Sequence, residues 1–295
     1  MDGWTGSDVT RCLFVSDLHG RAERYEKLWK AIGETVPDAV FLGGDLLPSG
    51  LLHTEPDNPV QQNFVSGYLA PGFERLRSRL RDRYPAVFLI MGNDDSRLDE
   101  PVFLDVATTG LWIYAHNRRC RFKQYDIYGY ACVPPTPFMP KDWERYDVSR
   151  YVPPGCISPE AGNRSIPCPE NEIRYATIQK DLELLVGQQS VEHAIFLFHS
   201  PPFETCLDRV ANEGKMIDFV PLDLHVGSIA IRRFIEQRQP LLSLHGHVHE
   251  SAGLTGSWRD RLSRTHMFGA AHDGPELSLV RFDPANLSKA SRDLL

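Results

Sequence analysis

Five apolar segments of strand length each end in residues that could bind a metal ion, and this pattern constrains the fold of the 295-residue chain more than any other feature. The segments read, in order, LFVSDLH, VFLGGDL, LIMGND, IFLFHS and LLSLHGHVH. A strand that is apolar along its whole length is buried on both faces, so the polar residues that follow it need partners where the strands end. Seven candidate ligands stand at these ends: Asp17, His19, Asp45, Asn93, His199, His245 and His247.

Helical patterns separate the first strands, which favours one α/β domain over residues 1–295 with a largely parallel sheet. In such a sheet, functional residues collect at the carboxyl ends of the strands. The expected strands lie at 12–16, 39–43 and 86–91, as two short strands within 120–133, and at 194–200, 241–250, 264–270 and 277–282. The expected helices lie at 21–36, within 61–84, and at 171–186 and 228–238.

The spacing of the candidate ligands suggests that they converge. In extended backbone, residues i and i+2 point to the same side, so Asp17 with His19, and His245 with His247, are each expected to face one point. Glycines next to these residues would let the backbone approach a bound ion closely. His249 continues the series, but we expect it to lie past the end of the site.

Composition narrows the classes of partner. The net charge of −7 argues against a nucleic acid or an anionic membrane as the main partner, because both need clustered positive charge. No apolar run approaches the roughly 20 residues that cross a bilayer, and no signal peptide is evident, so we predict a cytoplasmic protein. The six cysteines form no C-x-x-C pair, and we expect free thiols. The oligomeric state stays open.

The ordered motifs, D-x-H, G-D, G-N, a lone His and G-H-x-H, resemble the calcineurin-like metallophosphoesterase family from about residue 12 to 249. The resemblance implies a four-layer αββα sandwich, in which two mixed β-sheets are flanked by helices. We assign the final histidine pair to His245 and His247. The resemblance then implies one ion held by Asp17, His19, Asp45 and His247, and a second held by Asp45, Asn93, His199 and His245.

This ligand set implies hydrolysis of a small phosphorylated substrate. Two divalent ions, two carboxylates and one bridging hydroxide leave the centre near a charge of about +1, which attracts phosphate. Paired ions can lower the pKa of a shared water toward roughly 7 and hold the phosphoryl group during in-line attack. The ligand types suit divalent or trivalent Mn, Fe, Zn, Co or Ni. Asn93, His199 and the neighbouring Asp94 are the expected catalytic residues.

One position departs from the family pattern. Most relatives continue G-N with a histidine, which contacts the phosphate or protonates the leaving group, whereas this chain has Asp94 followed by Asp95. An ionised Asp94 cannot donate a proton and repels phosphate. We hypothesise that Asp94 binds a hydroxyl or amine of the substrate, or turns away from it. The extra carboxylate slightly favours phosphodiesters over phosphomonoesters. Asp95 is expected to cap the next helix or to support a ligand.

A proline-rich insertion at 134–169 holds nine of the 22 prolines. It could be a cap over the metals that sets substrate choice, a surface excursion, or a subunit contact. If it is a cap, its phosphate-facing candidates are Lys141, Arg145, Arg150 and Arg164, and His116 is a further candidate. The arginines at every second position from Arg75 to Arg83 enclose Leu76 and Leu80, which indicates a solvated helix face.

A non-catalytic binding scaffold of the same fold is the alternative from another functional class. Such a protein could lose its metal ligands without penalty, whereas all seven candidates are present here. The chain has neither the G-x-x-x-x-G-K-[ST] nor the G-x-G-x-x-G motif, which disfavours nucleotide-dependent transfer and hydride chemistry. Metal analysis together with assays on a nitrophenyl diester and monoester would separate an enzyme from a scaffold.

Overall fold

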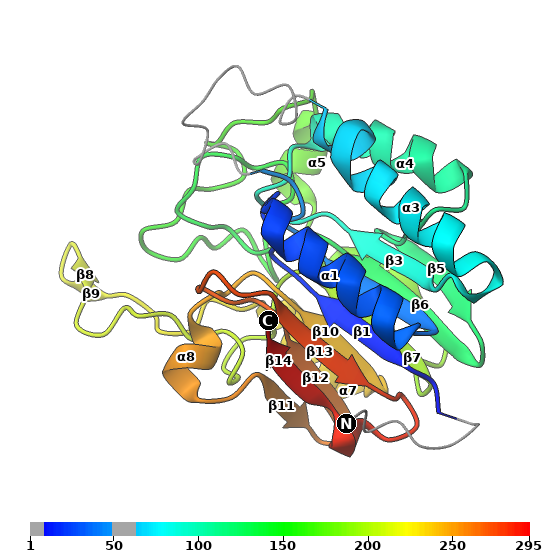
Figure 1. Cartoon of the computed structure of the whole chain (residues 1–295). Coiled ribbons are helices and arrows are strands. Elements are labelled where there is room, and N and C mark those ends of the chain that lie inside the picture. The colour runs from blue at the N-terminus through cyan, green and yellow to red at the C-terminus, as the bar shows by residue number, and fades with distance from the viewer. Residues whose placement is uncertain (1–8, 49–62) are drawn as a thin grey trace.

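The computed structural model describes residues 9–48 and 63–295, and its centre is a pair of mixed β-sheets packed against each other (Figure 1). The first sheet has the order β14-β13-β1-β2-β3-β4, in which β1 to β4 run parallel, β13 pairs antiparallel with β1, and β14 pairs antiparallel with β13. Its strands are β1 (Cys12–Val15), β2 (Ala39–Gly43), β3 (Ala86–Ile90), β4 (Ile113–Tyr114), β13 (Ser278–Phe282) and β14 (Ser291–Leu294).

The second sheet has the order β11-β12-β10-β7-β6-β5, with a parallel centre and antiparallel edges. Its strands are β5 (Arg118–Phe122), β6 (Tyr125–Tyr130), β7 (Ala194–Phe198), β10 (Leu242–His245), β11 (Arg259–Leu262) and β12 (Thr265–Gly269). A separate two-stranded ribbon, β8 (Met216–Ile217) with β9 (Val220–Pro221), projects from the body of the molecule (Figure 1).

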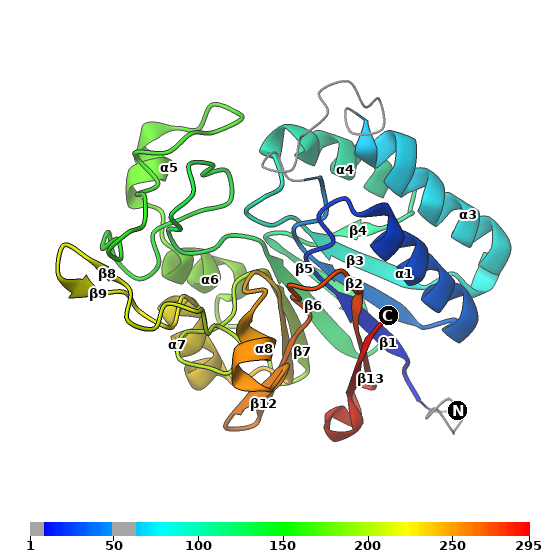
Figure 2. The ribbon, with the colours of Figure 1, turned by 60° about the vertical axis from the view of Figure 1, so that its left-hand side comes forward.

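Helices cover the outer face of each sheet (Figure 2). On the first sheet lie α1 (Ala22–Thr35), α3 (Ala70–Leu80), which continues a π-helix at Val65–Leu69, and α4 (Glu100–Thr108). On the second sheet lie α6 (Ile178–Val186) and α7 (Ile229–Arg238), while the short α5 (Glu170–Tyr175) and α8 (Ser251–Thr255) belong to peripheral segments. The four-layer αββα sandwich predicted from the sequence is therefore confirmed.

Burial explains why the central strands are apolar without alternation. Every residue of β1, β2, β7 and β10 is buried, because each strand has a helical layer on one side and the other sheet on the opposite side. Stacked rings fill the core, such as Phe41 on Phe88 and Tyr128 on Phe196. The predicted apolar face of α1 is buried as expected. The core therefore fixes where each strand ends.

Two expectations about elements differ from the structure. The helix predicted at 171–186 is two helices, α5 and α6, because Ala176 and Thr177 are extended and the Ile178 amide donates to the Tyr146 carbonyl. The strand predicted at 241–250 ends at His245, and the following residues turn. The expected helix within 61–84 is present from Val65 to Leu80, while residues 61 and 62 lie outside the described part.

The sheet order brings the candidate residues to one edge. Strands β1, β2 and β3 are parallel neighbours, so their carboxyl ends lie side by side, and β7 and β10 are parallel neighbours in the second sheet.

All six cysteines are within the described residues and none is in a disulfide; Cys12 and Cys132 are buried. Over residues 9–48 and 63–295, no helix has the length and apolar character of a membrane span.

Candidate metal centre

Four side chains at the joined strand ends form a group with metal-ligand geometry. Asp17, His19, Asp45 and His249 each offer one ligand atom, and these atoms all lie within 4.8 Å of one another. The His249 Nε2 atom is 3.1 Å from Asp17 Oδ1 and 3.1 Å from His19 Nε2. Asp17 and Asp45 are buried. The group therefore combines two buried carboxylates with two imidazoles around one point.

A second group shares Asp45. The Nδ1–H of His199 donates to the Gly43 carbonyl at 2.8 Å, so the ring presents Nε2 to the centre. That Nε2 lies 3.2 Å from Asp45 Oδ2 and 3.0 Å from Asn93 Oδ1. The ring of His247 lies beside that of His199, with centroids 5.2 Å apart. Asp45 thus stands between two groups of ligand atoms.

The backbone reaches this arrangement through strained turns rather than extended strands. Asp17, His19, Asp45 and His247 have φ values of 57°, 48°, 51° and 72°, in the left-handed region that non-glycine residues seldom adopt. Such conformations persist where the surroundings enforce them, and they cluster at functional sites. The expectation that residues i and i+2 converge through extended backbone was wrong, because these residues lie in turns that follow the strands.

Two glycines allow the turns to approach one another. A Cβ on Gly246 would lie 2.0 Å from Ser16 Oγ and 2.6 Å from Asp17 Oδ2, and a Cβ on Gly92 would lie 2.3 Å from Asp45 Oδ1. With no side chain at position 246, the His247 amide donates to both carboxylate oxygens of Asp17, at 3.1 and 3.2 Å. The turn after β10 is therefore fixed against the turn after β1.

The structure corrects the expected roles of His245 and His249. Both ring nitrogens of His245 have other partners: Nδ1–H donates to the Ser200 carbonyl at 3.0 Å, and Nε2 accepts from the Ser243 hydroxyl at 2.8 Å. The ring stacks on Phe198, away from the cluster. His249, expected to lie past the site, is in the cluster instead. The sequence carried the signal, because G-H-x-H begins at Gly246 and its two histidines are His247 and His249.

Titration of these groups reflects their mutual proximity. Burial opposes ionisation of Asp17, but the hydrogen bond from His249 and the charges of His249, His199 and His19 together outweigh burial and lower the carboxyl pKa. Burial acts to lower the pKa of His199, but the charge and hydrogen bond of Asp45, with the charge of Asp17 and the bond to Gly43, together raise it to about 10. The half-buried His247 lies near His199, and loss of solvation lowers its pKa to about 3. The two carboxylates therefore demand positive charge at this place.

The residues fit a pair of metal ions. No lysine or arginine pairs with Asp17 or Asp45 in the part of the chain that the structure describes, and His19 Nδ1 is buried without a hydrogen-bond partner. Three atoms also converge: His199 Nε2, Asp45 Oδ2 and Asn93 Oδ1. The two oxygens can only accept hydrogen bonds, so they cannot bond to each other. Carboxylate, imidazole and amide oxygen donors are the ligand types of first-row transition metals. Bound cations would balance the two carboxylates and give the converging Asp45 and Asn93 oxygens a common partner.

Asp94 and Asp95 both turn toward the ligands. Asp94 Oδ1 accepts from Asn93 Nδ2 at 3.0 Å, and Oδ2 lies 3.6 Å from His19 Nδ1. Burial and the charge of Asp45 raise the Asp94 pKa to about 7. The buried Asp95 accepts from the amides of Leu46, Leu47 and Gly92, at 3.1, 2.7 and 2.9 Å. Asp95 thus joins the turns that carry Asp45 and Asn93, which is the supporting role expected for it.

Three expected substrate contacts are engaged elsewhere. Lys141 is fully buried, and its Nζ donates to Glu144 at 2.6 Å and to the Thr136 carbonyl at 3.0 Å. Arg145 pairs with Glu172 at 2.5 Å and Asp181 at 3.0 Å. The half-buried His116 packs between the rings of Tyr130 and Trp143, and its Nδ1 accepts from the Ala131 amide. Lys141 in particular is not free to meet a phosphate, because its Nζ is buried in an ion pair with Glu144.

Arg24 is a supporting residue that sequence reasoning missed. It lies on the buried face of α1 and donates to the carbonyls of Asp17 and Gly274, both at 2.5 Å. This contact holds the turn after β1 against the loop that precedes β13. A charged residue on the apolar face of the predicted helix was the only sign in the sequence, and it names no partner.

The insertion contacts the ligand turns directly. The Trp143 indole N–H donates to the Asp95 carbonyl at 2.9 Å, and the Arg97 amide donates to Asp142 at 2.9 Å. The strand pairing of the insertion consists of isolated bridges, such as Pro140 with Asn163 inside it and Glu144 with the preceding Val133. The insertion therefore packs beside the turn that carries Asn93 and Asp94.

Comparison with known proteins follows this geometry. A model of the calcineurin-like phosphoesterase family matches residues 10–251. No curated protein matches the sequence. The solved structure of TT1561 from Thermus thermophilus is 16% identical, covers 97% of this chain and 99% of its own, and has a TM-score of 0.52, which shows a shared fold. A dimetal phosphatase from Danio rerio is 11% identical, covers 93% of each chain and has a TM-score of 0.45.

Proposed function

Because the chain belongs to the calcineurin-like phosphoesterase family, as the match over residues 10–251 shows, we propose that it hydrolyses small phosphoesters at a dinuclear metal centre. The observation that carries the proposal is the buried Asp45 carboxylate, which lies within ligand distance of two separate groups. A shared carboxylate between two sets of ligand atoms is what a pair of adjacent ions requires.

The proposed ligand sets follow the geometry rather than the first sequence assignment. Asp17, His19, Asp45 and His249 would hold one ion, and Asp45, Asn93, His199 and His247 the other. When bound, the ions would activate water and neutralise charge on the phosphoryl group. The metal identity among Mn, Fe, Zn, Co and Ni is open, because these donors suit all five.

The surrounding residues would prepare the site without taking part in bond cleavage. Asp95 and Arg24 hold the turns, and Asp94 orients the Asn93 amide through its Nδ2. The Asp94 carboxylate also has a partly exposed side chain, with 29% of its surface accessible. It could therefore accept a hydrogen bond from a substrate hydroxyl or amine, as the sequence suggested.

We favour phosphodiesters over phosphomonoesters as the substrate class. A carboxylate at position 94 repels a dianionic monoester more than a monoanionic diester. The insertion at 134–169 packs beside the same turn, which supports a role for it as a cap over the substrate. The small phosphorylated substrate and the cytoplasmic location remain predictions.

A direct assay tests the proposal. Protein reconstituted with Mn²⁺ is expected to cleave bis-nitrophenyl phosphate with a larger kcat/KM than nitrophenyl phosphate, and Asp45→Ala should lower kcat/KM by at least about 10²-fold. Surface variant Lys289→Gln is the control, and its activity should equal that of the wild type. The alternative of a non-catalytic scaffold would prevail if metal-loaded wild type cleaves neither ester above the rate of Asp45→Ala.

A further inference from the structure

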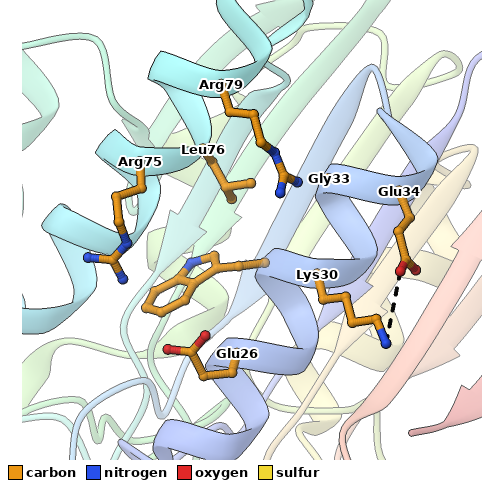
Figure 3. A pocket seen from close by; sticks show the side chains of 9 residues that line it. Glu26, Lys30, Gly33, Glu34, Arg75, Leu76 and Arg79 are labelled. Atoms are coloured by element: carbon orange, nitrogen blue, oxygen red, sulfur yellow. Dashed lines mark ion pairs between the residues drawn. The ribbon is translucent and has the colours of Figure 1, made fainter.

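A pocket of about 450 Å³ lies between α1 and α3, outside the metal centre (Figure 3). Its charged lining comprises Glu26, Lys30 and Glu34 from α1, with Arg75 and Arg79 from α3. Figure 3 shows the two arginines reaching from α3 toward α1. The volume is within the range of small-molecule sites, roughly 300 to 1,000 Å³.

Charge in this pocket is not balanced. Lys30 and Glu34 pair at 3.9 Å, and Glu26 accepts from the Tyr68 hydroxyl at 3.3 Å. Among the described residues, neither Arg75 nor Arg79 has a hydrogen bond or an ion pair, although the Arg75 guanidinium lies 5.5 Å above the Trp29 ring. Two guanidinium groups one helical turn apart therefore face the pocket with no acceptor.

A buried hydrogen-bond donor in the same pocket also lacks an acceptor. The Trp29 side chain lines the pocket and is only 6% exposed, yet its indole Nε1–H has no hydrogen-bond partner. A buried donor without a partner is costly, so a missing acceptor is indicated. The nitrogen itself is covered in this structure, and the exposed Arg75 guanidinium lies over the same ring, so a ligand would meet the donor only after side chains of the pocket shift.

Two glycines shape the pocket. A Cβ on Gly33 would lie 1.2 Å from Arg79 Nη2, and a Cβ on Gly72 would lie 1.9 Å from Trp29 Cζ2. Glycine at these positions thus lets the Arg79 side chain lie against α1 and lets α3 rest on the indole. Alanine would fill this space at both positions.

We propose that this pocket binds the phosphate group of a small anionic ligand, separately from the substrate of the metal centre. Arg75 and Arg79 would donate to the phosphate oxygens, because the guanidinium fork matches a tetrahedral oxyanion, and the Trp29 indole N–H would provide a further donor. Glu26 and Glu34 on the opposite wall disfavour a polyanion such as a nucleic acid. The ligand class is therefore a single phosphate group, free or as an ester.

Nuclear magnetic resonance of the five tryptophan indoles tests the proposal in zinc-reconstituted protein. The Trp29 resonance is identified by its loss in Trp29→Phe. Titration with inorganic phosphate or methylphosphonate should shift it saturably, and the double variant Arg75→Gln/Arg79→Gln should raise the dissociation constant about tenfold or more. Arg83→Gln, which removes an exposed charge from the same segment, is the matched control and should bind like the wild type.

The outcomes separate this pocket from the metal centre. Retention of the Trp29 shift in Asp45→Ala supports a second site even if the proposed hydrolysis fails. If hydrolysis is measured, an unchanged kcat/KM in the double variant supports the second site as well. Tighter binding of methylphosphonate, a non-hydrolysable analogue of a phosphate monoester, favours an esterified phosphate as the ligand. Tighter binding of inorganic phosphate favours the free ion, and equal binding shows that the pocket recognises the phosphate group alone. An unsaturable Trp29 shift, an equal shift with acetate, or unchanged binding in the double variant would overturn the proposal.

Discussion

Asp94 illustrates how a single residue can act on a metal centre through its neighbours. Its carboxylate accepts from Asn93 Nδ2 at 3.0 Å, which leaves Asn93 Oδ1 facing His199 Nε2. Its own amide donates to Asp45 Oδ1 at 2.8 Å. Position 94 therefore touches ligands of both proposed ions. A histidine here would accept the Asn93 amide hydrogen only through its unprotonated ring nitrogen, which depends on the tautomer. An ionised carboxylate accepts through either oxygen.

Removing the Asp94 carboxylate should weaken the binding of one metal ion more than that of the other. We expect Asp94→Ala to reduce the affinity for the second ion by about 10- to 100-fold, because partners that orient a ligand have effects of this size. Asp94→Asn, which keeps an acceptor oxygen, should stay close to the wild type. Calorimetric titration of metal-free protein with Mn²⁺ measures both sites. Equal isotherms for Asp94→Ala and the wild type would exclude the orienting role.

His116 should make stability depend on pH. Burial, together with the charges of Arg97, Arg145 and Arg118, lowers its pKa from 6.5 to about 3 in the folded chain. The unfolded chain therefore binds the proton first, and the stability that neutral His116 contributes above pH 6.5 is lost as the pH falls toward 3. At pH 5 the loss is about 2 kcal/mol.

Comparison of two variants isolates this effect. His116→Asn places an uncharged acceptor near the Ala131 amide, so its free energy of unfolding should fall by about 2 kcal/mol less than that of the wild type between pH 7 and pH 5. Urea denaturation in the presence of a chelator removes the contribution of metal binding. Parallel losses in the two proteins would show that His116 is protonated as readily in the folded chain as in the unfolded chain.

At the scale of elements, the proline-rich insertion depends on a buried ion pair instead of regular secondary structure. Lys141 and Glu144 are almost fully buried and bond at 2.6 Å, and Glu144 also accepts from the Thr136 amide and hydroxyl. Breaking a buried pair leaves one charge without compensation. The insertion should therefore be sensitive to loss of either partner.

We expect Lys141→Met to destabilise the protein by about 3 to 5 kcal/mol. Lys123→Met is a matched control, because Lys123 pairs with Asp38 at 2.8 Å on the surface, where such pairs contribute at most about 1 kcal/mol. Urea denaturation of both variants gives the comparison. If the two losses were equal, the insertion would not need the buried pair.

The sequence predicted those parts of the fold and the site that local patterns determine. Apolar runs located the central strands of both sheets, and the polar residues after them showed at which ends of the strands the ligand cluster lies. The break at Ala176 depends on pairing of residue 178 with the distant Tyr146, and the burial of Lys141 depends on tertiary packing. Neither leaves a mark in the local sequence. The role of His249 was mispredicted for a different reason, because its G-H-x-H motif could be recognised in the sequence.

At the scale of the whole molecule, the two sheets place ligands that no single element could gather. The first sheet supplies Asp17, His19, Asp45 and Asn93 from the turns after β1, β2 and β3, and the second supplies His199, His247 and His249 from those after β7 and β10. The centre therefore exists only when the sheets are packed face to face. Metal binding and folding of the sandwich should be coupled for this reason.

The number of metal ions bound per chain tests this account most directly. Elemental analysis of protein reconstituted with Mn²⁺ and freed of excess metal should give about two ions for the wild type and for His245→Gln, and about one for His249→Ala. A wild type that binds no metal, or a His249→Ala variant that keeps both ions while His245→Gln loses one, would contradict the proposed centre.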